Sequence, residues 1–178
     1  MGSGPQANRE SSLALRLLEQ FLQAGVETEH ALVTLNSALA LRGEAGGSTT
    51  IDLLSVDLFT GKCAVHKQGA APTYVRRDKR IQCAVGASLP AGIVTGEQAK
   101  PDVHRFRGAQ GDWIVMVTDG ILCGRDDQWI RDLLASYQGD SPSDLAQRIL
   151  RQSQDLCQGE DDGTVLAVHL ERSRDPLG

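Results

Sequence analysis

Two short acidic segments of the sequence contain the residue types that bind a hard divalent cation. In the first, an apolar run at residues 113–118 leads directly into Asp119, which a glycine follows. In the second, Asp161 and Asp162 precede another apolar run, at residues 164–170. Each pattern predicts a buried strand with a carboxylate fixed near one end, and carboxylate oxygens on rigid elements are ligands that Mg²⁺ and Mn²⁺ prefer. The chemistry that this arrangement favours is metal-assisted hydrolysis at phosphorus.

The same residues also fit a purely structural interpretation. An aspartate followed by glycine, as at Asp119, is a common turn sequence, and Asp161 lies in a polar stretch that is typical of a solvated loop. Local chemistry alone therefore leaves both interpretations open, and a metal site needs support from the rest of the chain.

The composition limits the classes of function. The chain has 178 residues, of which 40% are hydrophobic and 23% charged, as in a globular protein, and this length predicts a single domain at residues 1–178. The net charge of −5 argues against a nucleic-acid partner and against a metal nuclease, because both need clustered lysine and arginine. No apolar run approaches the ~18 residues of a membrane span, and no signal-peptide pattern begins the sequence. We therefore expect no membrane contact from this chain and a cytoplasmic location.

Cysteine and histidine residues give no metal-binding pattern. The four cysteines fit no C-x-x-C spacing, and the four histidines form no i, i+4 pair. We expect the cysteines to be reduced thiols packed in the core, so the carboxylates are the only candidate ligands.

The hydrophobic spacing predicts a chain that begins with two helices. Apolar residues between Leu13 and Leu22 recur at helical spacing, with Ser11 or Ser12 as the N-cap and Gly25 as the terminator. A second helix begins with Thr28 as its cap and ends before the glycine-rich stretch at residues 43–47. We expect these two helices to pack as an antiparallel pair.

Strand patterns fill the middle of the sequence, and helical patterns return near its end. Hairpins are predicted around the turns at residues 60–61 and 78–79, and Ser141 caps a helix that Gly159 ends. The element order predicts an α+β fold in which helices cover antiparallel sheet. The remaining predicted segments are strands at residues 102–107, 113–118 and 164–170, and a helix at residues 126–137.

Ordered landmarks over nearly the whole chain resemble the C-terminal phosphatase domain of the stage II sporulation protein E family, which belongs to the PP2C-like (PPM) phosphatases. Each landmark is a weak motif alone, but their order makes the set specific. The resemblance implies a layered α/β/β/α sandwich of antiparallel sheets flanked by helices. The landmarks are residues 1–11, 34–37, 52–61, 69–72, 88–93, 118–120 and 161–164.

The resemblance also implies roles for the acidic residues. Asp119 and Asp161 would be catalytic metal ligands, with Asp162 as a supporting residue or an alternative ligand. The implied cofactors are two Mn²⁺ or Mg²⁺ ions that orient the phosphate and activate water. The implied enzyme is a protein serine/threonine phosphatase that acts on phosphoserine in a phosphoprotein. Its expected substrate is a phosphorylated anti-sigma factor antagonist, in the control of a sporulation sigma factor.

The sequence departs from the family pattern at its start. The family has an Asp-Gly before the segment that resembles residues 1–11, and its carboxylate bridges both metals. We therefore expect an N-terminally incomplete domain that lacks its first strands and has weak or partial metal occupancy. A second departure is Gly163, where the family tends to have a larger apolar residue, so the loop that holds Asp161 could be loosened.

These departures keep a second function open. A catalytically impaired regulatory or phosphoprotein-binding module with the same fold would also fit the sequence. The basic residues Arg76, Arg77, Lys79 and Arg80 could attract an acidic phosphoprotein, but a solvated hairpin tip is the favoured interpretation. A homodimer and membrane anchoring of a longer parent protein are also left open.

Overall fold

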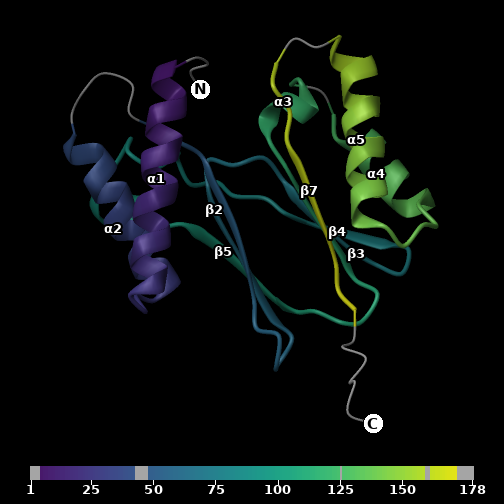
Figure 1. The fold of residues 1–178 in the computed structure, drawn as a ribbon, viewed down its shortest axis with the longest axis horizontal. Coiled ribbons are helices and arrows are strands. Elements are labelled where there is room, and N and C mark those ends of the chain that lie inside the picture. Colours follow the sequence, from purple (N-terminus) through teal and green to yellow (C-terminus); the bar gives the residue numbers. More distant parts are fainter. Residues whose placement is uncertain (1–4, 43–47, 125, 159–160, 172–178) are drawn as a thin grey trace. The chain divides into compact units, whose positions relative to one another are not determined.

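The structure is a computed structural model that describes residues 5–42, 48–124, 126–158 and 161–171 (Figure 1). The predictions for residues 1–4, for the glycine-rich stretch at 43–47 and for Gly159 lie outside these residues. Packing divides the chain into two compact units. The first unit comprises Met1–Leu54, Ala64–Ala70 and Gly86–His104, and the second comprises Ser55–Cys63, Ala71–Val85 and Arg105–Gly178. The single domain predicted for residues 1–178 stays a prediction.

Two helices form the core of the first unit. Helix α1 (Pro5–Gln23) and helix α2 (Thr28–Leu41) run side by side in opposite directions (Figure 1), as predicted. Their apolar faces meet in one cluster, against which Ile51 and Leu53 also pack. The cluster consists of Ala14, Leu18, Ala31, Leu32, Leu35, Leu39 and Ala91.

The boundaries of these helices correct the predicted caps. Helix α1 begins at Pro5, so Ser11 and Ser12 lie inside the helix and neither is its N-cap. Proline favours the first helical position because its φ angle is already helical and its missing N–H is not needed there. Helix α2 has Glu27 as its N-cap instead of Thr28, and the Glu27 carboxylate accepts a hydrogen bond from the backbone N–H of His30 at 3.1 Å. The termination near Gly25 is confirmed, with a φ of +77° at this glycine.

A three-stranded sheet follows the helices. Its strands are β1 (Ile51–Val56), β2 (Lys62–Gln68) and β5 (Asp102–Arg107), in the order β1-β2-β5. In the first unit, the buried Lys67 Nζ lies 2.8 Å from Asp52 Oδ2. Burial lowers the pKa of Lys67, although the ion pair with Asp52 opposes this change. A short 3₁₀ helix, Gly96–Ala99, was not predicted.

A four-stranded antiparallel sheet forms the centre of the second unit. The strand order is β4-β3-β6-β7, and the predicted hairpin around residues 78–79 is confirmed. Asp78 has a φ of 54° in its turn, a conformation that aspartate tolerates better than most residues. The strands are β3 (Thr73–Arg77), β4 (Arg80–Ala84), β6 (Trp113–Val117) and β7 (Val165–His169).

Three helices accompany this sheet. Helix α4 (Gln128–Ser136) packs on β3 and β4, helix α5 (Pro142–Cys157) packs on β7, and the four-residue helix α3 (Asp119–Leu122) packs on α5. Every side chain of β6 is buried. The shared core consists of Tyr74, Trp113, Val115, Val117, Ile121, Ile130, Leu134, Tyr137, Leu145 and Ile149. The predicted α+β class, with antiparallel sheets flanked by helices, is confirmed.

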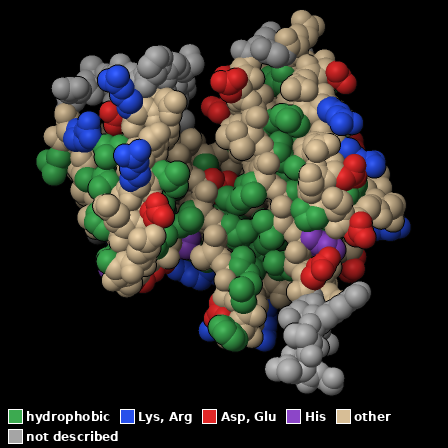
Figure 2. All heavy atoms as spheres, viewed as in Figure 1, with side chains coloured by type: hydrophobic (Ala, Val, Ile, Leu, Met, Phe, Trp, Pro, Cys, Tyr) green, Lys and Arg blue, Asp and Glu red, His purple; other side chains and the backbone are tan. Residues whose placement is uncertain are grey.

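Two further observations concern the apolar character of the helices and the distribution of surface charge. Within the described ranges, no helix is both long and apolar enough to cross a membrane. On the face drawn in Figure 2, acidic and basic side chains are interspersed over α4 and α5 instead of forming a single basic patch.

Candidate metal centre

Strands β6 and β7 bring the two acidic segments to the same end of the four-stranded sheet. Val117 at the end of β6 pairs with Val165 at the start of β7, so the residues beyond this pair continue side by side. The backbone N–H of Thr118 donates to the Thr164 carbonyl at 3.1 Å, and the Thr164 N–H donates to Thr118 Oγ1 at 2.9 Å. These two hydrogen bonds connect the residue before Asp119 to the second segment.

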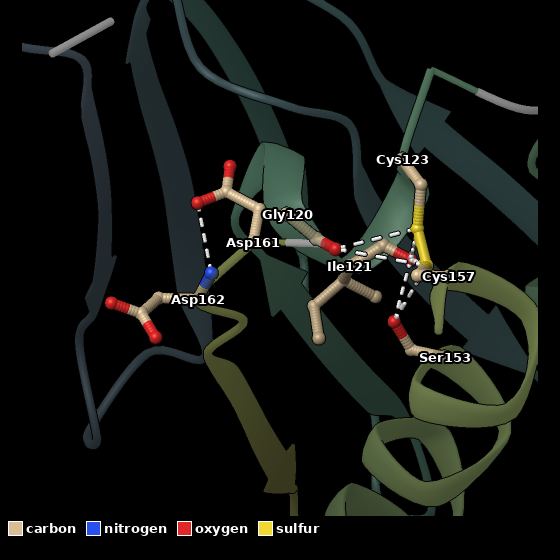
Figure 3. The surroundings of a disulfide bond; sticks show 7 residues. All are labelled: Gly120, Ile121, Cys123, Ser153, Cys157, Asp161 and Asp162. Carbon is tan, nitrogen blue, oxygen red and sulfur yellow. Dashed lines mark hydrogen bonds between the residues drawn. A yellow bond between two sulfur atoms is a disulfide. The ribbon is translucent and has the colours of Figure 1, made fainter. Parts of the chain in front are cut away.

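The segments approach each other most closely at Gly120. A Cβ atom added to this glycine would overlap the carbonyl oxygen of Asp162 and would lie 3.5 Å from the Cβ of Asp161. Figure 3 shows Asp161 directly beside Gly120. Only glycine allows backbones to meet this closely. The structure therefore brings the Asp119 and Asp161 segments together, although their roles as ligands stay predictions.

The three predicted site carboxylates face solvent. Asp119, Asp161 and Asp162 are all exposed. Asp161 Oδ1 accepts a hydrogen bond from the backbone N–H of Asp162 at 2.8 Å, which fixes the orientation of the Asp161 carboxyl group. By contrast, the ion pairs found among the described residues of the second unit use other acidic residues, namely the aspartates at positions 112, 127 and 144 and Glu171.

As metal ligands, the three site carboxylates fit one hard divalent cation better than two. They are exposed carboxylates, and Mg²⁺ is usually held by one or two carboxylates while it keeps several waters. Among the residues that the structure describes, no group of three or more His, Cys, Asp or Glu side chains is arranged to hold a metal ion. The described residues therefore do not supply the full ligand set that a two-ion site needs.

The expectation of four reduced thiols is wrong for two of the cysteines. Cys123 and Cys157 form a disulfide between the end of α3 and the end of α5, whereas Cys63 and Cys83 are free. The 34-residue separation gave no sequence motif, because the pair is formed by the packing of α3 on α5. The positioning roles of Thr118 and Thr164 were not predicted either. The feature of the sequence that could have indicated these roles is the threonine next to each acidic motif.

The basic hairpin residues divide into two kinds. Arg76 donates to the carbonyls of Leu134 and Tyr137, both at 2.8 Å, at the C-terminal end of α4, and Arg77 forms an ion pair with Asp112 at 2.7 Å. Lys79 and Arg80 are exposed near the turn, as the solvated hairpin interpretation predicts. Two of the four basic residues therefore hold the fold together.

Gly163 lies against a buried side chain, and a loosened loop at this position stays a prediction. A Cβ atom added there would lie only 2.5 Å from Ile121 Cδ1. The side chain of Ile121, which is 1% exposed, thus fills the space that a larger residue at position 163 would need.

The family model "Stage II sporulation protein E (SpoIIE)" matches residues 1–171. A curated relative, the stage II sporulation protein E of Priestia megaterium, is 30% identical over 180 residues, which cover 97% of this chain. The chain spans 30% of the length of that relative.

Solved structures give the same match. The PP2C phosphatase domain of SpoIIE from Bacillus subtilis, solved with a fragment of its regulatory domain, is 28% identical, with a TM-score of 0.85 over 96% of this chain and 52% of the solved chain. A Mn-presoaked structure of the B. subtilis phosphatase domain is also 28% identical, with a TM-score of 0.65 over 89% of this chain and 74% of the solved chain. The fold described above is thus similar to that of a PP2C phosphatase domain.

Proposed function

The chain belongs to the stage II sporulation protein E family, and from this premise we propose that it is a metal-dependent protein serine/threonine phosphatase domain. The observation that carries the proposal is the contact between the Asp119 and Asp161 segments at the shared end of β6 and β7. The matched B. subtilis domain, which was presoaked with Mn in one structure, supports both the activity and the metal. In this proposal, residues 1–178 act as one PP2C-like domain in the cytoplasm.

The residues present have distinct tasks in this chemistry. Asp119 and Asp161, with Asp162 as a supporting or alternative ligand, would hold Mn²⁺ or Mg²⁺, which supplies charge neutralisation at the phosphate and acidifies water. The hydrogen bonds between Thr118 and Thr164 hold the two segments at a fixed spacing. The Asp162 N–H orients the carboxyl group of Asp161. Because all three carboxylates are exposed, a phosphate on the surface of another protein can reach them.

The proposed substrate is phosphoserine on a phosphorylated anti-sigma factor antagonist, in sporulation sigma-factor control. Family membership supports this substrate class. A folded phosphoprotein is also compatible with carboxylates at the exposed end of a sheet, where no deep pocket is needed to receive the ester.

The test is turnover of p-nitrophenyl phosphate with and without Mn²⁺. Two proteins are compared. One is residues 1–178, and the other is a longer form with the additional aspartate that the family resemblance implies ahead of residue 1. We expect Mn²⁺-dependent turnover that Asp119→Asn lowers by at least about 100-fold, because this change weakens the binding of the cation that would neutralise the phosphate. Asp78→Asn is the matched control, since Asp78 is exposed in a hairpin turn. Full turnover in Asp119→Asn would refute the site.

A second candidate is a phosphoprotein-binding module without turnover. The observation that favours it is that the described residues include no group of three metal-binding side chains. If residues 1–178 and the longer form both bind a phosphoserine peptide but neither hydrolyses it with Mn²⁺, this second function replaces the first.

A further inference from the structure

The Cys123–Cys157 disulfide lies immediately behind the candidate metal centre. Cys123 follows helix α3 with a φ of 49°, and its backbone N–H donates to the carbonyl of Asp119 at 3.1 Å. Cys157 is the last residue of α5. The two Cα atoms are 5.9 Å apart, within the usual span of a disulfide. The bond thus joins the short helix that begins with Asp119 to a sixteen-residue helix.

Both sulfur atoms contact the backbone of the turn that carries Asp119. Cys123 Sγ lies 3.5 Å from the Gly120 carbonyl oxygen, and Cys157 Sγ lies 3.8 Å from that of Ile121 (Figure 3). Ser153, one turn earlier in α5, donates to the same Ile121 carbonyl at 2.9 Å. A helix of four residues cannot be stable by itself, because it is too short to recover the cost of nucleation. Its position therefore depends on its attachment to α5.

The same attachment supports the second acidic segment. The chain leaves α5 at Cys157 and reaches Asp161 four residues later. Asp161 and Asp162 then pass close to Gly120, which lies three residues before the other half of the disulfide. The disulfide therefore links the chain just after the first acidic segment to the chain just before the second.

We propose that the Cys123–Cys157 disulfide is a reversible redox clamp that holds the Asp119 and Asp161 segments in place, and that its reduction loosens them and weakens cation binding. The clamp itself is independent of the proposed phosphatase function. Only the effect on cation binding rests on that function.

The reductant that the clamp requires is a dithiol. One thiolate of the dithiol attacks Cys123 Sγ, because Cys123 is half-buried whereas Cys157 is 6% exposed. The S–S bond breaks, Cys157 leaves as a thiolate that takes up a proton, and a mixed disulfide forms at Cys123. The second thiol of the reductant then displaces Cys123 and becomes oxidised to a cyclic disulfide. Two electrons and two protons pass to the two cysteines, and a disulfide oxidant reverses the reaction.

The other cysteines provide an internal comparison. Cys63 is 3% exposed and Cys83 is half-buried, and both are free. Burial raises the pKa of both thiols, so they stay protonated and exchange slowly. A response to dithiols should therefore come from the Cys123–Cys157 pair.

The clamp is tested on the metal-free chain by hydrogen exchange. The chain is oxidised with glutathione disulfide or reduced with dithiothreitol, and exchange is followed for the backbone N–H groups of Ile121 and Cys123. We expect at least about 10-fold faster exchange after reduction, since local opening sets the rate there. Amides of the central strands β3 and β6 should stay unchanged. Equal rates at residues 121 and 123 in the two states would overturn the clamp.

Variants make the test specific. The double variant Cys123→Ser, Cys157→Ser should exchange like the reduced chain with or without dithiothreitol, whereas Cys83→Ser should keep the full response. A dithiothreitol response that persists in the double variant would overturn the assignment to this pair. So would a count of four free thiols after oxidation with glutathione disulfide, since the clamp leaves only Cys63 and Cys83 free.

Calorimetric titration with Mn²⁺ separates the clamp from the phosphatase proposal. We expect affinity to fall by about 10-fold on reduction, the size of effect seen when residues that support metal ligands are lost. Equal Mn²⁺ affinity in both states would refute the link between clamp and cation. No Mn²⁺ binding in either state would refute the metal site itself, while the exchange result would still decide the clamp.

Discussion

The two ends of strand β6 hold aspartates in opposite environments. Asp112, just before the strand, is 1% exposed, and both its carboxylate oxygens bind the Arg77 guanidinium, at 2.9 and 2.7 Å. It also accepts a hydrogen bond from the N–H of Ala109 at 2.7 Å. Asp119, just after the strand, is exposed and lies beside a second acidic segment. The aspartate before β6 is thus paired with an arginine inside the fold, whereas the aspartate after β6 is accessible to solvent.

Strand β6 thus has a structural carboxylate, Asp112, at one end and a candidate functional carboxylate, Asp119, at the other. A buried carboxylate with a bidentate arginine contributes to stability but cannot bind a ligand without losing its partner. Acidic groups that converge at a solvent-exposed end contribute little to the fold, so their proximity calls for another explanation. Substitutions at the two ends of β6 test this difference.

Gly120→Ala tests the contact between the two acidic segments. Its methyl group would overlap the Asp162 carbonyl, which is backbone and cannot rotate away. We expect the free energy of unfolding to fall by about 3 kcal/mol in urea denaturation, the upper range for overpacking, and Mn²⁺-dependent turnover to fall with it. Gly163→Ala is the matched control, because the closest atom to its methyl group would be the end of the Ile121 side chain and not a backbone atom. Equal losses in the two variants would argue against a special contact at Gly120.

Asp112→Asn tests the opposite end of the strand. The change removes the charge that pairs with Arg77, and we expect the free energy of unfolding to fall by about 2 kcal/mol. The expected cost is below that of a fully buried pair, because the Arg77 side chain is 52% exposed and water can solvate it. Metal affinity should not change. If Asp112→Asn lowers Mn²⁺ affinity as strongly as Asp119→Asn, the division between the two ends is wrong.

The pH dependence of stability should report Asp112. Burial raises the pKa of this carboxyl, but the hydrogen bond from Arg77, the Ala109 N–H and the Arg77 charge together outweigh it, so the pKa lies below the usual value of 3.8. A lowered pKa means that the folded state favours the ionised form, so this stabilisation is complete above about pH 5 and is lost as the pH falls through the folded-state pKa. We expect a shallower acid limb for Asp112→Asn in urea unfolding between pH 3 and 7. Parallel limbs would show that Asp112 does not contribute.

Lys79→Glu should have the smallest effect. Lys79 is exposed at the hairpin turn, so we expect the free energy of unfolding to change by less than about 0.5 kcal/mol. Turnover of a phosphoprotein should change by less than about 2-fold, because an exposed charge outside the site is screened by salt. A large rise in KM would instead show that the hairpin attracts the substrate.

Local patterns were sufficient to predict most of the second unit. The apolar run of β6, the hairpin around residues 78–79 and the Ser141 cap of α5 are all properties of short segments, and the structure has them where they were expected. The start of α1 was placed too late, because the serines at positions 11 and 12 resemble caps although the helix already begins at Pro5.

The missed features of the site depend on contacts between distant segments. The pairing of Cys123 with Cys157 follows from the packing of α3 on α5, and a sequence spacing of 34 residues contains no trace of it. Arg77 was grouped with its basic neighbours because a charge run is visible in the sequence, whereas its partner Asp112 is 35 residues away. Sequence identifies which residues carry charge, but the fold decides which charges are neutralised.

The threonine pairing across β6 and β7 has a consequence for how this protein tolerates change. Two hydrogen bonds between Thr118 and Thr164 hold Asp119 close to the second acidic segment, although 41 residues lie between Asp119 and Asp161 along the chain. The exposed residues 138–140, between the buried Tyr137 and the Ser141 cap of α5, can therefore lengthen without altering that spacing. Insertions at this turn offer a place to attach a tag or probe while the acidic pair keeps its geometry.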